Sequence, residues 1–217
     1  VPGQTLSGEY GTGPGGKGFN QATAAARAGA ATTFVCALGE DVGAQWARAL
    51  AAADGIHLHE QCSALPTGTA GIYVDHAGRN SIVIGAGANA ALSPAFIESQ
   101  RTQIEASAVV LAQLESPIDA VAAALRIARA RGVLTLLNPA PANVVVPPEL
   151  WADVDVATPN ETEFCAHLLH DCGEVMDPDL LGACEDAELH SLCRRWQPAA
   201  TVVVTLGASG CFISHPA

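Results

Sequence analysis

Short apolar runs rich in β-branched residues recur along the chain, and stretches of helical composition separate them. Strands are expected at 32–38, 108–114, 133–137, 154–157 and 201–206, and helices at 17–30, 42–53, 117–131, 159–170 and 185–196. Buried strands that alternate with helices predict an α/β fold with a doubly wound, mostly parallel sheet flanked by helices. Because ligands of such sheets bind at the carboxyl ends of the strands, functional residues are expected directly after strands.

The alternation breaks at residues 69–86. There the runs TAGIYVD and NSIVIGA flank the turn-rich HAGR, which predicts an antiparallel hairpin in a small separate sheet. Residues 1–14 are polar and glycine-rich with short alternating stretches, a pattern typical of half-exposed strands. Residues 171–184 are the least regular segment and are expected to form a surface loop.

Composition narrows the classes of partner and compartment. The chain of 217 residues has 22 acidic against 10 basic side chains, a formal charge of −12, which disfavours nucleic acid as a partner. No window approaches about 18 uninterrupted apolar residues and no basic-then-apolar leader opens the sequence, so neither a membrane span nor secretion is expected. The seven cysteines form an odd set without a CxxC pair, which indicates a reducing cytoplasm rather than a disulfide framework.

One group of potential metal ligands stands out in the sequence. Cys165, His167, His170 and Cys172 lie close together, but their spacing matches no common zinc pattern. Ordinary helix and loop residues are therefore the favoured interpretation.

The most distinctive local pattern is Gly15–Gly18 with Phe19 and Asn20, where glycines expose backbone N–H groups just as a helix begins. Such a place suits an anionic or polyhydroxyl ligand. Residues 11–17 also fit the GxxxxGK part of a P-loop, but Gly18 follows where a Ser or Thr should bind magnesium, so the P-loop interpretation fails.

The same glycines partly match a dinucleotide-binding motif. Gly13, Gly15 and Gly18 fit GxGxxG, and Glu40 or Asp41 follows about twenty residues later, as that motif requires. The preceding TLSGEYGT is too polar for the buried first strand of such a unit. A nicotinamide-dependent oxidoreductase therefore stays a minor alternative.

Glu115 ends the run AVVLAQLE, so its carboxylate should lie at the ligand-binding edge of the sheet. A carboxylate there can accept hydrogen bonds from sugar hydroxyls. Equally, Glu115 can be a first-turn residue that favours the positive end of the next helix.

The segment 158–163 reads as a helix start. Thr158 is expected as the N-cap, Pro159 as the first helical residue, and Glu161 as the partner in a capping box. Asn160 and Glu163 share one face, where they could hold phosphate and the waters of a magnesium ion. A solvated acidic helix end is the alternative.

A glycine-containing turn leaves the apolar strand TVVVTL, and its backbone is open to a nucleotide or forms a plain hairpin turn into 211–213. Its residues are Thr205, Leu206, Gly207, Ala208, Ser209 and Gly210. Asn138–Ala142 also follow a strand, but their prolines indicate a rigid rim, and no catalytic role is assigned to them.

Seven segments, in this order and spacing, resemble the PfkB-type carbohydrate kinase family, and ribokinases in particular. They are GPGGKGFNQA, PTGTAGIYVD, GAGANAALSP, QLESP, LNPAPA, TPNETE and VTLGASG, and the resemblance runs from Pro2 to about Ile213. It implies a ribokinase-like fold in a single domain over 1–217. The segments 1–14 and 67–86 would form a β-lid over the sugar, which in this family often makes a homodimer interface.

The resemblance also implies roles for individual residues. Gly16, Lys17, Gly18, Asn20 and Glu115 would bind the sugar. Asn160 and the residues from Thr205 to Gly210 would line the ATP site, and Glu163 would influence the Mg²⁺ bound to the phosphates.

The sequence departs from the family at both ends. Family members begin with a strand carrying an Asn and Asp pair that grips the sugar, and later carry a GAGD-type motif whose Asp takes the hydroxyl proton. Nothing precedes Val1 and no GxGD occurs, so the chain is expected to lack both the N-terminal strand and the catalytic segment, with the K⁺-binding loops, and to be inactive or nearly so. No residue is assigned as catalytic.

The expected activity is ATP-dependent phosphorylation of D-ribose to D-ribose 5-phosphate. Another sugar or nucleoside kinase of the same family remains open, and so does a non-catalytic sugar- or nucleotide-binding protein.

Overall fold

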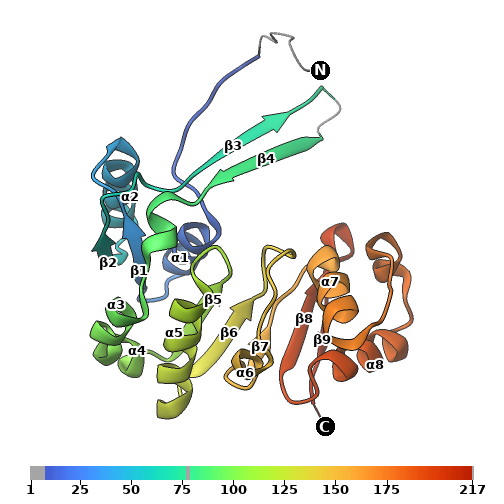
Figure 1. Cartoon of the computed structure of the whole chain (residues 1–217). Helices are drawn as coiled ribbons and strands as arrows, with labels where there is room; N and C mark the ends of the chain where they lie inside the picture. Colours follow the sequence, from blue (N-terminus) through green and yellow to red (C-terminus); the bar gives the residue numbers. More distant parts are fainter. Residues whose placement is uncertain (1–7, 77–78, 217) are drawn as a thin grey trace.

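The computed structural model describes residues 8–76 and 79–216 and has a body of strands and helices from which one hairpin projects (Figure 1). The strands are β1 (Thr33–Leu38), β2 (His57–Cys62), β3 (Thr69–Val74), β4 (Asn80–Gly85), β5 (Val109–Gln113), β6 (Leu134–Asn138), β7 (Val156–Ala157), β8 (Thr201–Thr205) and β9 (Cys211–Ser214). The helices are α1 (Lys17–Arg27), α2 (Val42–Ala53), α3 (Pro94–Ser99), α4 (Arg101–Ala106), α5 (Ile118–Arg131), α6 (Pro148–Trp151), α7 (Glu161–Cys172) and α8 (Asp186–Trp196), with 3₁₀ turns η1 (Gly87–Ala91), η2 (Pro178–Ala183) and η3 (Gly207–Ser209).

The main sheet has five strands in the order β5-β6-β7-β8-β9, parallel except for β9, which runs antiparallel to β8. The predicted mostly parallel α/β sheet is thus confirmed. The parallel strands do not all belong to one sheet. β1 and β2 form a separate parallel pair, and within the described residues no strand joins β1 to β5 by backbone hydrogen bonds.

The largest core lies on one face of the main sheet. The inward side chains of β6 and β8, such as Leu137 and Val202, are fully buried there against Leu125 of α5 and against Phe164 and Leu168 of α7. Each such side chain contributes about 1.5–3 kcal/mol by leaving water, which makes this layer the main source of stability. None of the helices within 8–76 and 79–216 is long and apolar enough to cross a bilayer.

The opposite face of the main sheet is largely uncovered. By strand register and alternation this open face comprises Val109, Leu111, Leu134, Leu136, Val156, Val203 and Ile213. Four of these are large exposed hydrophobic residues, with exposed fractions of 46% for Val109, 43% for Leu111, 44% for Leu134 and 52% for Ile213. Parallel sheets normally bury both faces, whereas α5 and α7 cover this one from the side of the main core.

The hairpin β3–β4 confirms the antiparallel pair expected at 69–86, with Ile72 opposite Ile82 (Figure 1). Its base is held tightly: a Cβ on Gly87 would lie 2.2 Å from the Pro66 carbonyl oxygen, and one on Gly68 would lie 2.7 Å from that of Ala86. The half-exposed strands expected at 1–14 are wrong for residues 8–14, which form no strand, and 1–7 lie outside the described residues. Polar, glycine-rich sequence without an apolar face gave that segment little to pair with.

Some elements were not expected from the sequence. Strand β2 reads HLHEQC and lacks an apolar run. Its polar side chains have tertiary partners instead, as in the bidentate ion pair between Arg48 and Glu60. The expected loop 171–184 contains η2, whose Leu181 is fully buried and anchors the segment in the main core.

Candidate functional site

Four parallel strands of the main sheet end along one edge, and a polar side chain lies at the end of each. Gln113 ends β5, and its register partner Asn138 ends β6. Thr158 follows β7 directly, and Thr205 ends β8. The predicted location of functional residues, at the carboxyl ends of strands, therefore gathers a row of amides and hydroxyls.

Helix α1 is capped by a side chain far away in the sequence. Gly16 has φ 91° and ψ 147°, a conformation essentially restricted to glycine, which turns the chain so that the Lys17 N–H donates to Glu115 Oε2 at 2.8 Å. The carboxylate thus satisfies a free helix N–H and lies at the positive end of the dipole. Glu115 does not lie in the first turn of α5, which begins at Ile118, so the second interpretation of this residue is wrong.

Gly18 allows a close approach between α1 and β5. A Cβ at Gly18 would lie 2.8 Å from Gln113 Nε2 and 3.2 Å from the ring of Phe34. The Oε1 of Gln113 in turn accepts from the Glu115 N–H at 2.6 Å. The glycine, the amide and the carboxylate therefore form one packed unit.

A small hollow opens beside this unit. Its polar lining comes from Gly16, Asn89, Gln113, Glu115 and Ser116, and the space measures about 80 Å³. The hollow is thus large enough to admit small polar groups. Of the predicted sugar residues, Gly16, Gly18 and Glu115 line the hollow; Lys17 is half-buried and Asn20 is exposed on the same turn of α1.

The start of α7 differs from the predicted one by two residues. Asn160, not Thr158, is the N-cap: its Oδ1 accepts from the Glu163 N–H at 2.8 Å, and Glu163 Oε2 accepts from the Asn160 N–H at 2.9 Å. The capping box is therefore Asn160–Glu163 rather than Thr158–Glu161. The shift follows from this reciprocal amide–carboxylate pair, which satisfies two backbone donors at once.

Glu163 is 5% exposed, whereas Asn160 is exposed at the edge of the sheet. The Thr205 N–H donates to the Pro159 carbonyl at 2.9 Å, and Asn160 forms a parallel bridge with Thr205. The two predicted nucleotide segments thus lie side by side.

The 205–210 segment does make the plain hairpin turn, from β8 through η3 into β9. Gly207 and Gly210 have φ of 52° and 93°, and the Leu206 N–H donates to the Gly210 carbonyl at 2.8 Å. Leu206 is half-buried, while Thr205 and the residues from Gly207 to Gly210 are exposed. The hairpin geometry leaves the backbone accessible, so the two interpretations are compatible.

Asn138 was assigned no role from the sequence, but it joins several parts of this edge. Its Nδ2 donates to the Thr158 carbonyl at 2.6 Å, and its Oδ1 accepts from Gln21 Nε2 of α1 at 3.5 Å. The only sequence signal was a polar residue at the carboxyl end of a strand, masked by the prolines that follow it.

The dinucleotide-binding interpretation finds no support in the geometry. No strand precedes Gly13 in residues 8–12, and Asp41 caps α2 instead of reaching a ribose. Asp41 accepts from the hydroxyl and the N–H of Thr67, both at 2.7 Å. Hydrogen bonds from the Thr67 side chain, then from the Ala44 and Thr67 N–H groups, lower the pKa of Asp41.

The Cys165–Cys172 group is structural. His167 is 2% exposed, stacks on Trp196 at 5.5 Å and contacts the Pro139 carbonyl through Nε2 at 3.3 Å; burial lowers its pKa. Burial raises the pKa of Cys165 to about 11. Among the described residues, no three His, Cys, Asp or Glu side chains converge as metal ligands, and all seven cysteines are free thiols.

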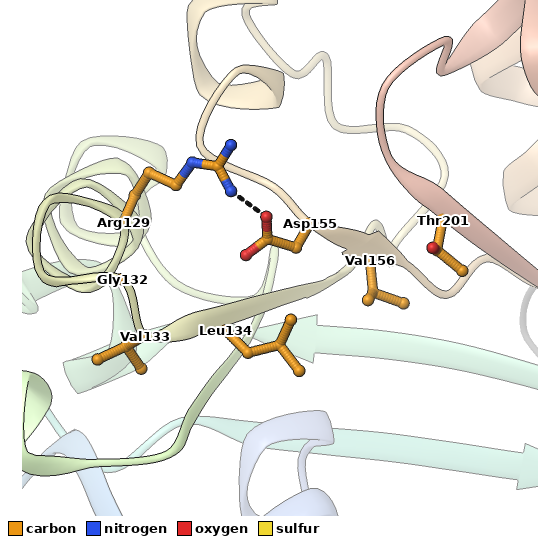
Figure 2. A pocket seen from close by; sticks show the side chains of 7 residues that line it. All are labelled: Arg129, Gly132, Val133, Leu134, Asp155, Val156 and Thr201. Carbon is orange, nitrogen blue, oxygen red and sulfur yellow. Dashed lines mark hydrogen bonds and ion pairs between the residues drawn. The ribbon is translucent and has the colours of Figure 1, made fainter. Parts of the chain in front are cut away.

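A larger hollow of about 490 Å³ lies at the other end of the strands (Figure 2). It is lined by Leu134, Val156 and Thr201, and the Arg129–Asp155 ion pair crosses its rim. Burial alone would raise the pKa of Asp155, but hydrogen bonds from Thr135 and the charge of Arg129 outweigh it, so the pKa is lowered. Its charged groups satisfy one another, and it belongs to the open face.

Comparison with known proteins agrees with this architecture. Residues 3–217 match the model of the pfkB family carbohydrate kinases. The chain is 39% identical over 218 residues to a ribokinase of Haemophilus influenzae, covering 99% of this chain and 68% of the relative. It is 37% identical to a mouse ribokinase, covering 97% of this chain and 64% of the relative.

Solved structures show the same fold. A ribokinase from Giardia lamblia superposes with a TM-score of 0.83 at 28% identity, covering 98% of this chain and 69% of that one. An Arabidopsis thaliana ribokinase complexed with ribose and ATP gives 0.83 at 26% identity, covering 99% and 68%. The chain thus spans about two thirds of the length of these relatives. Its family match across nearly every residue, the ordered carboxyl edge and the projecting hairpin together establish that the chain belongs to the PfkB family of carbohydrate kinases.

Proposed function

We propose that this chain carries the sugar- and nucleotide-binding parts of a kinase that transfers the γ-phosphate of ATP to the 5-hydroxyl of D-ribose. The observation that carries the proposal is the common edge of the main sheet, where Glu115 follows β5 and Asn160 and Thr205 follow the ends of β7 and β8. The ribokinases among its relatives, one of them complexed with ribose and ATP, support the choice of substrate.

The sugar would bind at the start of α1. Glu115 uses Oε2 for the Lys17 N–H, and we assign its Oε1 to a sugar hydroxyl. Gly16 and Gly18 leave the backbone approachable, and Lys17 and Asn20 would add donors from the first turn of the helix. These groups are hydrogen-bonding partners suited to a polyhydroxyl ligand.

The nucleotide would bind over Asn160 and residues 205–210, with its phosphates toward the start of α7. Magnesium is the ion expected with ATP, and when bound it would neutralise charge on the phosphates. Asn160 and Glu163 offer few oxygen ligands, which fits an ion that keeps several waters and phosphate oxygens of its own. Because Glu163 Oε2 is engaged in the capping box, we assign it a contact through water rather than direct coordination.

In the reaction the ribose hydroxyl oxygen attacks the γ-phosphorus, the bond to the β–γ bridging oxygen breaks, ADP leaves and the hydroxyl proton passes to a base. No residue of this sequence is assigned as that base, and the sequence contains no GxGD. We therefore expect the 217 residues to bind ligands but to turn over slowly or not at all. The K⁺ requirement expected from the family stays a prediction.

Calorimetric titration of the chain with ribose, and separately with ATP and Mg²⁺, tests the proposal. Binding of both is expected, together with loss of ribose binding in Glu115→Gln and retention of it in Glu149→Gln, a first-turn residue of the distant α6. If the wild type does not bind ribose but binds another sugar or a nucleoside, that compound would replace ribose as the proposed substrate. Rapid ribose-dependent ADP formation by this chain would refute the expectation of slow turnover.

A non-catalytic sugar- or nucleotide-binding protein is the second candidate, because the groups proposed above are binding groups and none of them is assigned as a base. Binding of both ligands by the product of the complete gene, without ADP formation, would select it. The free thiols accord with the reducing cytoplasm that we infer for either function.

We also infer that the hairpin mediates a homodimer. One of its faces carries four exposed apolar side chains, with exposed fractions of 60% for Ile72, 65% for Val74, 52% for Ile82 and 57% for Ile84. Apolar patches of this kind mark interaction surfaces. Sedimentation should show a dimer that Ile72→Glu dissociates, whereas a monomeric wild type would refute the interface.

A further inference from the structure

The two proposed ligand sites come from different parts of the chain. The sugar side is α1 with Glu115, and the nucleotide side is the start of α7 with the β8–β9 turn. In-line phosphoryl transfer requires the acceptor hydroxyl and the phosphate to be held in register, and errors of about 1 Å cost heavily in rate. Some group must therefore fix the distance between the two sides.

Asn138 lies between them. It ends β6, which stands between β5 and β7 in the sheet. Its Nδ2 donates to the Thr158 carbonyl at 2.6 Å, and its Oδ1 accepts from Gln21 Nε2 at 3.5 Å. A single half-buried amide thus contacts an element of each side.

Each contact is close to proposed ligand-binding residues. Gln21 lies four residues after Lys17 and hence on the same face of α1, and the Lys17 N–H holds Glu115 at 2.8 Å. On the other side, Thr158 is followed by Pro159, whose carbonyl accepts from the Thr205 N–H at 2.9 Å. Movement at Asn138 is therefore transmitted to both sites.

We propose that Asn138 is a positioning residue that sets the sugar-binding helix and the nucleotide-binding turn relative to each other; this inference rests on the proposed function. A primary amide suits the position, because it can donate to a carbonyl and accept from an amide at once. Aspartate in its place keeps an acceptor for Gln21 but faces the Thr158 carbonyl with a second acceptor. Leucine satisfies neither partner.

Calorimetry with ribose and with a non-hydrolysable ATP analogue tests the link, using the wild-type chain, Asn138→Asp, Gln21→Met and the matched control Asn143→Asp. Asn143 is exposed in the loop after β6, so its change adds the same charge without touching the link. Asn138→Asp loses the hydrogen bond to the Thr158 carbonyl and turns two acceptors toward each other. Because the repelled carboxylate takes its contact with Gln21 along, both ligands should bind about 3- to 10-fold more weakly, the range for a lost hydrogen bond. Gln21→Met should weaken ribose alone, and Asn143→Asp should weaken neither.

Different failures have different signatures. A wild type that binds neither ligand would overturn the proposed function and this inference with it. A wild type that binds both, with Asn138→Asp unchanged or weakened for one ligand only, would overturn the inference alone. If Asn138→Asp does not fold, Gln21→Met decides: unchanged ribose affinity in that variant refutes the link.

Discussion

Replacing Gly18 by alanine separates the stability of α1 from its role in binding. Gly18 lies in the first turn of α1, and its φ is not in the left-handed range, so alanine is conformationally allowed. The new Cβ would lie 2.8 Å from Gln113 Nε2 and 3.2 Å from Phe34. Of these two neighbours Gln113 is expected to move, because its amide is the end of a flexible side chain.

The opposing terms in the free energy of unfolding are unequal. Alanine gains about 0.5–1 kcal/mol over glycine in a helix. Overpacking costs about 1–3 kcal/mol, and displacement of Gln113 gives up its 2.6 Å hydrogen bond to the Glu115 N–H, worth about 1 kcal/mol. A net destabilisation of roughly 1–3.5 kcal/mol is expected. A loss of ribose affinity of about tenfold should accompany it, because Glu115 loses its support.

Urea unfolding and ribose calorimetry on Gly18→Ala and Gly15→Ala measure the two effects. Gly15 is exposed and a Cβ there would meet nothing within 4 Å, so its variant should stay within about 0.5 kcal/mol of wild type and bind ribose equally well. Wild-type ribose affinity in Gly18→Ala would refute the argument that this close approach positions the carboxylate.

Three further predictions concern pH and packing. The pKa of Asp41 is lowered in the folded state, so the stability it provides is complete above about pH 4 and is lost as the pH falls through the pKa of the folded state. In urea unfolding, Asp41→Asn, which weakens the contact with Thr67, should lose less stability than the wild type as the pH is lowered. Burial lowers the pKa of His167 from 6.5, so below about pH 6.5 the unfolded state binds more protons than the folded state. Thermal unfolding of the wild type should therefore show a stability that declines below about pH 6.5, and His167→Gln should not show this decline. Phe164→Ala removes a fully buried ring that packs edge-on to Trp196 at 5.6 Å and should cost about 3–5 kcal/mol by chemical denaturation.

Elements with a clear apolar period could be predicted from sequence. Helix α2 at Val42–Ala53 is confirmed to the residue, and the strands of the main sheet match their β-branched runs within about two residues. Strand β2 could not be predicted, because its polar side chains are satisfied by tertiary partners such as Arg48. The start of α7 was misplaced because Thr158 and Asn160 are equally good caps by residue type, and only the Asn160–Glu163 pairing decides between them.

The candidate site was predictable in its parts but not in its connections. Strand ends and glycines pointed to Glu115 and to the start of α1. That the Lys17 N–H binds Glu115, 98 residues away, depends on how α1 packs against β5, which no local pattern encodes. The same holds for Asn138, whose function depends on partners on two other elements.

The open face of the main sheet governs how this chain will behave at high concentration. Aliphatic side chains from β5, β6 and β9 form a water-exposed apolar surface on one side of the molecule. The net charge of −12 opposes the association of two such surfaces. Added salt shortens the distance over which this charge repulsion acts, and it leaves the apolar attraction between the open faces intact. Light scattering should therefore rise with ionic strength, and polar replacements at Leu111 and Leu134 should suppress the rise without touching the ligand-binding edge.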